Sequence, residues 1–227
     1  MNVRLITCLW ALIPVLAFGA TREQREYTQV MAAKPDLAHG AELFTRCVQC
    51  HGADGGGVVS GSVPRIAGQH FSVLARQIVQ FRTGQHWDMR MEGVASSHEI
   101  FSSPQDIADV ANYVSTLEQD GKRGIGYGDH LDLGRAFYVS ACASCHGKQG
   151  EGDAGKGIPR LAGQHAAYLV RQIYDAVDAR RPALTASHRK RLAPLTFDEV
   201  LGITDYLSRI GWKPEAQPNA EDGRPGP

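Results

Sequence analysis

The sequence lacks an excess of either charge. Its 24 lysine and arginine residues balance 24 aspartate and glutamate residues in a chain of 227. Such a balance gives no reason to expect binding to nucleic acid or to an anionic membrane surface. Aromatic residues are also few, at 7%, whereas the 25 glycines are typical of small domains rich in loops. Helical domains of this size bury little of their own surface, so each core needs material beyond its side chains.

Cysteine is scarce as well, with five in the chain. Cys8 lies in an apolar N-terminal stretch, and the other four form two Cys-x-x-Cys-His motifs at residues 47–51 and 142–146. If that stretch is an export signal that is cleaved off, Cys8 is lost with it, and no cysteine is left over for a disulfide, for a thiolate axial ligand or for a catalytic nucleophile. Methionine is scarcer still, with four in the chain, and the last of them is Met91.

Cys-x-x-Cys-His is the attachment motif of a c-type haem. Residues three and four apart share a helix face, so one helical turn presents two thiols and an imidazole to one macrocycle. A single motif would also suit a redox-active cysteine pair. A structural zinc site shared by the two motifs is not expected, because the motifs lie too far apart for the usual spacing of zinc ligands. Two copies predict two covalently bound haems, each completing one core. The residues so assigned are Cys47, Cys50 and His51 in the first copy and Cys142, Cys145 and His146 in the second.

The first residues have the pattern of an export signal. Arg4 precedes an apolar run over residues 5–18, and small residues around Gly19 suit a signal peptidase. We expect cleavage after Gly19 or Ala20 and delivery to the periplasm. An uncleaved membrane anchor is the alternative, although the run is shorter than the about 20 residues that a spanning helix needs.

The sequence repeats itself with an offset of 95 residues. The offset relates the two haem motifs and two Pro-Arg-[Ile/Leu]-Ala-Gly-Gln-His segments, at 64–70 and 159–165, so we infer an internal duplication. Helical periodicity over 71–81, a helix start at Ser103 and a capping box at Thr196 predict an all-α fold of two tandem domains. The expected divisions are a signal peptide at 1–19, a flexible lead at 20–35, domain 1 at 36–117, a linker at 118–130, domain 2 at 131–211 and a disordered tail at 212–227.

These motifs give the chain a resemblance to the c4-type diheme cytochromes c. The resemblance rests on the haem motifs, the repeated segments and the linker sequence at 126–129, and it covers roughly residues 36–210. It implies a periplasmic electron carrier made of two class I cytochrome c domains. It also implies that each iron is bound by the motif histidine and by a methionine ahead of the last helix. The carbonyls of Pro64 and Pro159 are implied to orient the proximal histidines.

In the first repeat, the ligand position of the family falls on a predicted loop that carries two methionines. Its spacing favours Met91 over Met89, with a short insertion at about 96–100 before the next helix. His86 and His98 stay open as alternatives, and either methionine can instead serve as packing.

The second repeat departs from the family, because no methionine follows Met91. Aligning the last helices of the two repeats leaves His188 at the expected ligand position, and we predict that it binds the iron of haem 2. An open or water-bound iron, Lys190 and His165 stay open as alternatives. His165 has a counterpart in His70, which favours a structural role common to both repeats.

Unequal ligands predict unequal potentials. A thioether ligand raises the potential of a haem, whereas a second imidazole gives a lower one. Haem 1, with His51 and Met91, is expected at the higher potential, and haem 2, with His146 and His188, at the lower. Electrons would then enter at haem 2 and leave from haem 1.

The expected partners are a redox protein donor and an acceptor, or a membrane oxidase or dehydrogenase, with no nucleic acid and no small-molecule substrate. A group of cations, uninterrupted by any acidic residue, flanks His188. These cations would steer an acidic partner, or they form a solvated surface that balances the charge of the haem propionates. Arg65 and Arg160 are weaker candidates for propionate contacts. The flanking cations are Arg180, Arg181, Arg189, Lys190 and Arg191.

A rival interpretation is a haem enzyme, a sensor or a subunit of a larger oxidoreductase. It needs an exchangeable sixth site on haem 2, together with acid and base groups that no clear carboxylate pair supplies. Carbon monoxide separates the interpretations, because a six-coordinate carrier binds it poorly. We therefore favour an electron carrier over an enzyme.

Overall fold

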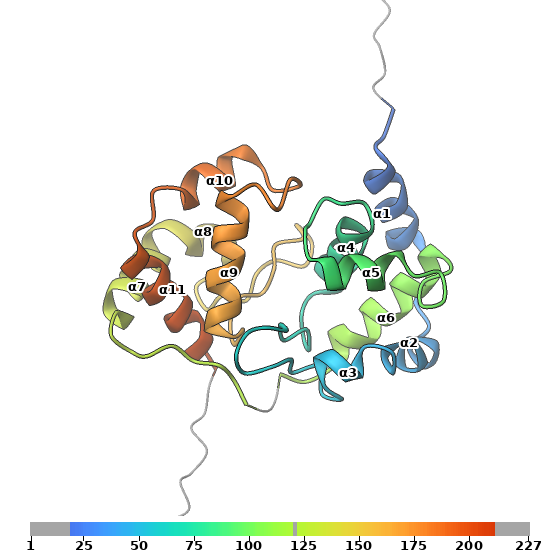
Figure 1. The fold of residues 1–227 in the computed structure, drawn as a ribbon, viewed down its shortest axis with the longest axis horizontal. Helices are drawn as coiled ribbons and strands as arrows, with labels where there is room; N and C mark the ends of the chain where they lie inside the picture. The colour runs from blue at the N-terminus through green and yellow to red at the C-terminus, as the bar shows by residue number, and fades with distance from the viewer. Residues whose placement is uncertain (1–18, 120–121, 212–227) are drawn as a thin grey trace, which may run out of the picture.

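The chain folds into two groups of helices that lie side by side and are joined by an extended segment (Figure 1). The structure is a computed structural model that describes residues 19–119 and 122–211. The predicted tail at 212–227 lies outside the described residues, as does the predicted signal peptide except for its last residue. Within the described ranges every regular element is a helix, apart from one isolated bridge between Asp153 and Ile158. The predicted all-α class is confirmed.

Each group of helices contains one repeat, and α9 of domain 2 faces domain 1 (Figure 1). Across residues 19–119 and 122–211, no helix combines the length and apolar character needed to cross a membrane. Domain 1 contains α1 (Arg22–Ala32), α2 (Leu37–Phe44), α3 (Val48–His51), α4 (Phe71–Arg82), α5 (Met89–Ser96) and α6 (Pro104–Thr116). Domain 2 contains α7 (Leu131–Phe137), the π-helix η1 (Tyr138–Cys142), α8 (Ala143–His146), α9 (Ala166–Val177), α10 (Ala186–Leu192) and α11 (Phe197–Arg209).

In each domain the helix before the haem motif crosses the last helix at a glycine. α2 packs against α6, and α7 packs against α11. A Cβ added to Gly40 would lie 2.2 Å from the carbonyl oxygen of Asp109, and one added to Gly134 would lie 1.9 Å from the carbonyl carbon of Gly202. Glycine therefore allows the two backbones to touch. The contact holds each haem motif, which follows shortly after this helix, in place.

Between this crossing and the haem motif, the second repeat is one residue longer than the first. The crossing glycine and the first motif cysteine are seven positions apart in domain 1 and eight in domain 2. The π-helix η1 absorbs the extra residue, because a π-turn takes up one residue more than an α-turn. The flanking packing is retained: ring centres are 5.5 Å apart for Phe44 and Tyr113, and 5.7 Å apart for Tyr138 and Tyr206.

The expectation of a flexible lead at 20–35 is wrong, because most of this segment forms α1. Thr21 caps the helix and makes a capping box with Gln24. Val30 is fully buried in the core of domain 1, and Glu26 accepts a hydrogen bond of 2.6 Å from Arg82 of α4. The partly buried Tyr27 also packs against this core, so the helix has an apolar face, although a short one.

The linker is bound to α11 over residues 126–128. Asp205 of α11 is 4% exposed and accepts hydrogen bonds from the N–H groups of Gly126, at 2.9 Å, and Gly128, at 2.7 Å. Arg209 donates to the same carboxylate, at 2.7 Å, and to the carbonyl of Gly126, at 2.8 Å. A Cβ added to Gly126 would lie 2.5 Å from Cγ of Asp205, so this docking requires glycine.

A buried carboxylate joins the start of α2 to α6. Asp109 is 1% exposed and accepts hydrogen bonds from the N–H of Asp36, at 2.7 Å, and from Nδ1 of His39, at 2.8 Å. The hydrogen bond to Asp109 raises the pKa of His39 above its ordinary value of 6.5. The protonated histidine therefore stabilises the fold fully below about pH 6.5, and this contribution is lost as the pH rises through the raised pKa.

We expect His39→Ala to lower the free energy of unfolding of domain 1 more at about pH 5.5 than at about pH 9, because only the protonated imidazole pairs with the carboxylate. Urea unfolding followed at the absorbance of haem 1 measures the difference. His130→Ala is the control, since His130 faces the exposed Asp198 at 3.6 Å in domain 2. An equal loss of stability at both pH values would contradict this account of His39.

Candidate haem sites and the domain interface

The two haem motifs adopt the same structure. One turn of helix, α3 or α8, ends at the histidine in each motif. Nδ1 of His51 donates to the carbonyl of Pro64 at 3.1 Å, and Nδ1 of His146 donates to that of Pro159 at 3.2 Å. Because Nδ1 carries the proton, Nε2 is the nitrogen available to a metal. Both prolines thus contact the histidines that the resemblance assigns to them.

The protonation of the motif residues suits haem attachment better than thiol redox chemistry. Burial lowers the pKa of His51 and of His146, so both imidazoles are neutral at physiological pH, the form that binds a metal. Burial also raises the pKa of the Cys47 thiol to about 11 and raises that of Cys142. A redox-active cysteine pair depends on a thiol whose pKa is lowered. The motifs therefore do not fit that alternative.

In domain 2 a second imidazole faces the motif histidine. The ring centre of His188 lies 6.2 Å from that of His146. Metal–imidazole bonds are about 2.0 Å long, so two imidazoles bound to one metal have ring centres about 6 Å apart. Burial and the nearby His146 lower the pKa of His188, which keeps it neutral. His188 lies in the helix α10, and Thr185 caps this helix by accepting the N–H of His188 at 3.2 Å.

In domain 1 the segment that carries both methionines is also a helix, α5, and not the expected loop. Asp88 caps it by accepting the N–H groups of Arg90, at 3.1 Å, and Met91, at 3.4 Å. The charge of Arg90 lowers the pKa of His51, and the charge of Asp88 raises it. Met89 is 87% exposed, whereas Met91 is half-buried.

The histidines kept open as alternative ligands have other surroundings. His86 is 2% exposed and stacks on a phenylalanine ring, and burial lowers its pKa to about 3. His98 is exposed. His165 is fully buried, with Nδ1 accepting from the N–H of Gly124 at 3.0 Å and Nε2 donating to the carbonyl of Gly56 at 2.8 Å. Both ring nitrogens of His165 are therefore engaged in hydrogen bonds within the protein.

The two Pro-Arg-[Ile/Leu]-Ala-Gly-Gln-His segments meet at the interface between the domains. The side chain of Gln164 accepts from the N–H of Arg65, at 3.0 Å, and donates to its carbonyl, at 2.7 Å. Gln69 makes the same two bonds to Arg160, each of 2.9 Å. These reciprocal contacts give the interface an approximate twofold symmetry.

A second pair of contacts follows the same symmetry. Nε2 of His70 donates to the carbonyl of Glu151 at 2.8 Å, as His165 does to that of Gly56. Gly56 and Glu151 lie in the loops that follow the two haem motifs. Each repeated segment therefore orients its own proximal histidine and also binds the haem loop of the other domain. The repetition is visible in the sequence, but the contacts that the repeated segments make across the interface are not.

The arginines of these segments lie at the same interface. Arg65 is 3% exposed, and its Nη2 donates to the carbonyl of Lys122 at 3.1 Å. Arg160 has a buried Nε that meets no hydrogen-bond acceptor among the described residues. Buried donors need a partner, and a carboxylate is the strongest partner for a guanidinium. Arg160 therefore fits a haem propionate.

The cationic rim near His188 is smaller than expected. Arg181 is half-buried, and burial lowers its pKa. Arg189 folds back and donates to the carbonyl of Leu184. The members of the set that face solvent are Arg180, Lys190 and Arg191.

The two helical domains and their paired motifs define a diheme c-type cytochrome. The cytochrome c family model matches residues 37–118 and 131–210. Cytochrome c4 of Stutzerimonas stutzeri is 30% identical, with 81% of this chain and 93% of that protein covered. A Stutzerimonas stutzeri (strain A1501) protein named thiosulfate dehydrogenase electron acceptor is 29% identical, with 83% and 94% covered. The crystal structure of reduced cytochrome c4 from Pseudomonas stutzeri has a TM-score of 0.67 at 26% identity, over 78% of this chain and 100% of that chain.

The chain therefore belongs to the cytochrome c family and, within it, to the cytochromes c4. It binds two covalently attached c-type haems and acts as an electron carrier. When bound, each haem supplies a one-electron couple at its iron. Among the described residues the buried apolar cluster of domain 2 contains four side chains, against eleven in domain 1.

Proposed function

We propose that this chain is a periplasmic diheme electron carrier whose two haems differ in axial ligands and potential. His51 and Met91 bind the iron of haem 1, and His146 and His188 bind that of haem 2. A thioether raises the potential and a second imidazole lowers it, so haem 1 has the higher potential. Electrons enter at haem 2 and leave from haem 1. Export follows from the signal predicted at 1–19.

The separation of 6.2 Å between the rings of His146 and His188 carries this proposal. Two imidazoles face each other at the distance that one metal between them requires, and neither is protonated at physiological pH. For haem 1 the support is the greater burial of Met91 than of Met89, together with the charges of Asp88 and Arg90 at the start of α5, which act on the pKa of His51.

A spectroscopic redox titration tests the assignment of haem 1. The wild type should show two one-electron steps, and Met91→Ala should lower the upper midpoint potential on the order of 0.1 V while leaving the lower one unchanged. Met89→Ala is the matched control and should shift neither step, because Met89 lies in solvent two positions away. Two equal midpoint potentials in the wild type, or the lower potential on haem 1, would contradict the proposed direction of electron transfer.

The name of one relative suggests the class of donor. That protein is named an electron acceptor of thiosulfate dehydrogenase, and this chain matches 94% of its length. We assign this chain an enzyme donor that oxidises thiosulfate. Rapid mixing of the oxidised carrier with such an enzyme and thiosulfate should accumulate reduced haem 1 first, because an electron that enters at haem 2 passes to the haem of higher potential. Accumulation of reduced haem 2 while haem 1 is still oxidised would contradict electron transfer from haem 2 to haem 1.

A further inference from the structure

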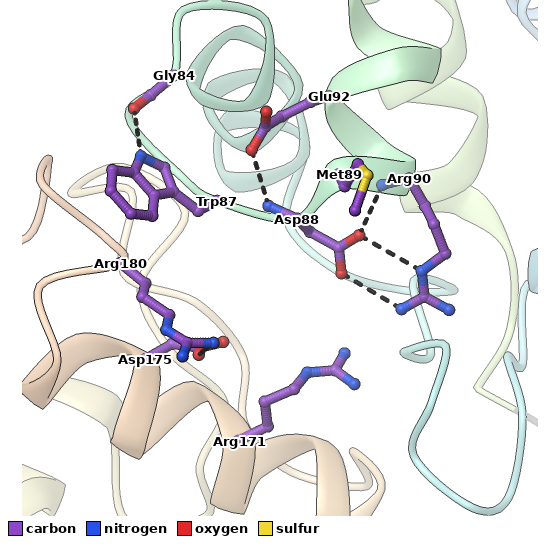
Figure 2. Close-up of a pocket in the computed structure, with 9 residues that line it drawn as sticks. All are labelled: Gly84, Trp87, Asp88, Met89, Arg90, Glu92, Arg171, Asp175 and Arg180. Carbon is purple, nitrogen blue, oxygen red and sulfur yellow. Dashed lines mark hydrogen bonds and ion pairs between the residues drawn. The ribbon is translucent and has the colours of Figure 1, made fainter.

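A cavity of about 660 Å³ opens between the domains, beside the segment that leads into α5. One wall is the segment 84–92 of domain 1, and the other is α9 with the residues that follow it in domain 2 (Figure 2). The N–H of Trp87 donates to the carbonyl of Arg180 at 2.9 Å, which joins the two walls. Arg171 extends from α9 towards the space between them (Figure 2).

Two large apolar side chains stand exposed at this cavity. Trp87 is 57% exposed and Met89 is 87% exposed. The indole Nε1 of Trp87 donates to the carbonyl of Gly84 at 3.1 Å, and its backbone N–H is held by the other domain. An aromatic ring held in this way loses little conformational freedom when a partner covers it. Tryptophan is one of the residue types enriched among those that dominate binding at protein interfaces.

The charge around these side chains is positive towards solvent, although the acids and bases lining the cavity are equal in number. Arg90 pairs with Asp88, and the two side chains are 61% and 24% exposed. Arg180 pairs with Asp175, and these are 58% and 12% exposed. In both pairs the guanidinium faces outward and the carboxylate lies behind it. A partner approaching the cavity therefore meets apolar side chains bordered by cations.

The position of the cavity connects it to haem 1. Met89 and Met91 lie in the first turn of α5, and Asp88 caps that turn from the wall of the cavity. We propose that Trp87 and Met89, bordered by Arg90 and Arg180, form the docking site of a redox protein whose contact surface is apolar with an acidic border. The redox protein bound at this site accepts the electron that leaves haem 1, so the inference rests on the proposed function.

The test measures binding of the holoprotein to an acidic blue-copper protein by calorimetry at low salt. Trp87→Ala should raise the dissociation constant by about 10- to 30-fold, as expected for the central residue of an interface. Tyr127→Ala, which removes a 97% exposed ring from the linker, should change it by less than about twofold. Added salt should weaken the complex, and Arg180→Glu should slow its formation.

Three results would overturn the docking site: no binding of the acidic probe by the wild type, equal losses in Trp87→Ala and Tyr127→Ala, or equal binding of a basic mono-haem cytochrome. Trp87→Ala should also leave both midpoint potentials unchanged, and a shift in either would place Trp87 in the haem environment instead. The ligand assignments are tested on the isolated protein. They can therefore fail while the docking result stands, and the reverse also holds.

Discussion

Replacing His188 with alanine is expected to open the sixth position of haem 2 and to make the reduced protein bind carbon monoxide. The reason is the facing arrangement of His146 and His188, at 6.2 Å between ring centres, in a domain without any methionine. Without the second imidazole, the iron keeps one protein ligand and changes from low spin to high spin. One of the two haems should then bind carbon monoxide, whereas the wild type should bind almost none.

His188→Met separates the identity of the ligand from its presence. A thioether at this position should keep haem 2 low-spin and raise its midpoint potential on the order of 0.1 V, a small part of the about 0.8 V that axial ligands span. Lys190→Ala is the neighbouring control on α10 and should change neither the spin state nor the potential. A low-spin signal of haem 2 that survives His188→Ala would contradict this assignment and would indicate another strong ligand, such as Lys190.

Gly134→Ala is expected to destabilise domain 2 by about 3 kcal/mol or more. The new Cβ would lie 1.9 Å from the carbonyl carbon of Gly202, where both contact atoms belong to backbone and no side chain can move aside. Overpacking of this kind costs about 1–3 kcal/mol and sometimes more. For a domain of this length, that loss lowers the unfolding temperature by about 10 °C or more. Thermal unfolding followed at the absorbance of each haem should show the shift at haem 2.

Two alanine substitutions provide controls for this experiment. Gly40→Ala makes the equivalent change in domain 1, with a Cβ 2.2 Å from the carbonyl oxygen of Asp109, and should shift haem 1 instead. Gly93→Ala lies in α5, where an added Cβ would meet nothing within 4 Å, so it should stabilise the protein by about 0.5–1 kcal/mol. Equal effects of Gly134→Ala and Gly93→Ala would show that α7 and α11 do not cross in this close contact.

The sequence predicted the parts of this protein that depend on neighbours along the chain. The haem motifs, the duplication, the helix over 71–81 and the capping box at Thr196 are all visible as short spacings, and the structure contains each of them. The sequence predicts a loop where α5 forms, because this helix has few apolar residues, although Val94 packs against the core of domain 1 and Ala95 is buried. For α1 the sequence carries the Thr21–Gln24 capping box and only a short apolar face, and contacts with α4 stabilise the helix.

The unequal repeats show the same division. The absence of methionine after Met91 is a fact of the sequence and predicts an unusual ligand in domain 2. Only the packing of α10 against α9 brings His188 opposite His146. The extra residue in the second repeat is likewise visible by counting, but its absorption in η1 depends on Tyr138 keeping its contact with Tyr206.

The sequence by itself therefore determined the chemistry: two thiol pairs, two proximal histidines and one repeat without a methionine. These follow from residue types at fixed spacing, because one helical turn places residues three and four apart on the same face. The tertiary structure decided how the two halves are joined. The bonds of Gln69 and Gln164 across the interface, and the cavity beside Trp87, connect residues about 90 positions apart. Such contacts depend on how whole domains pack, and no local pattern encodes them.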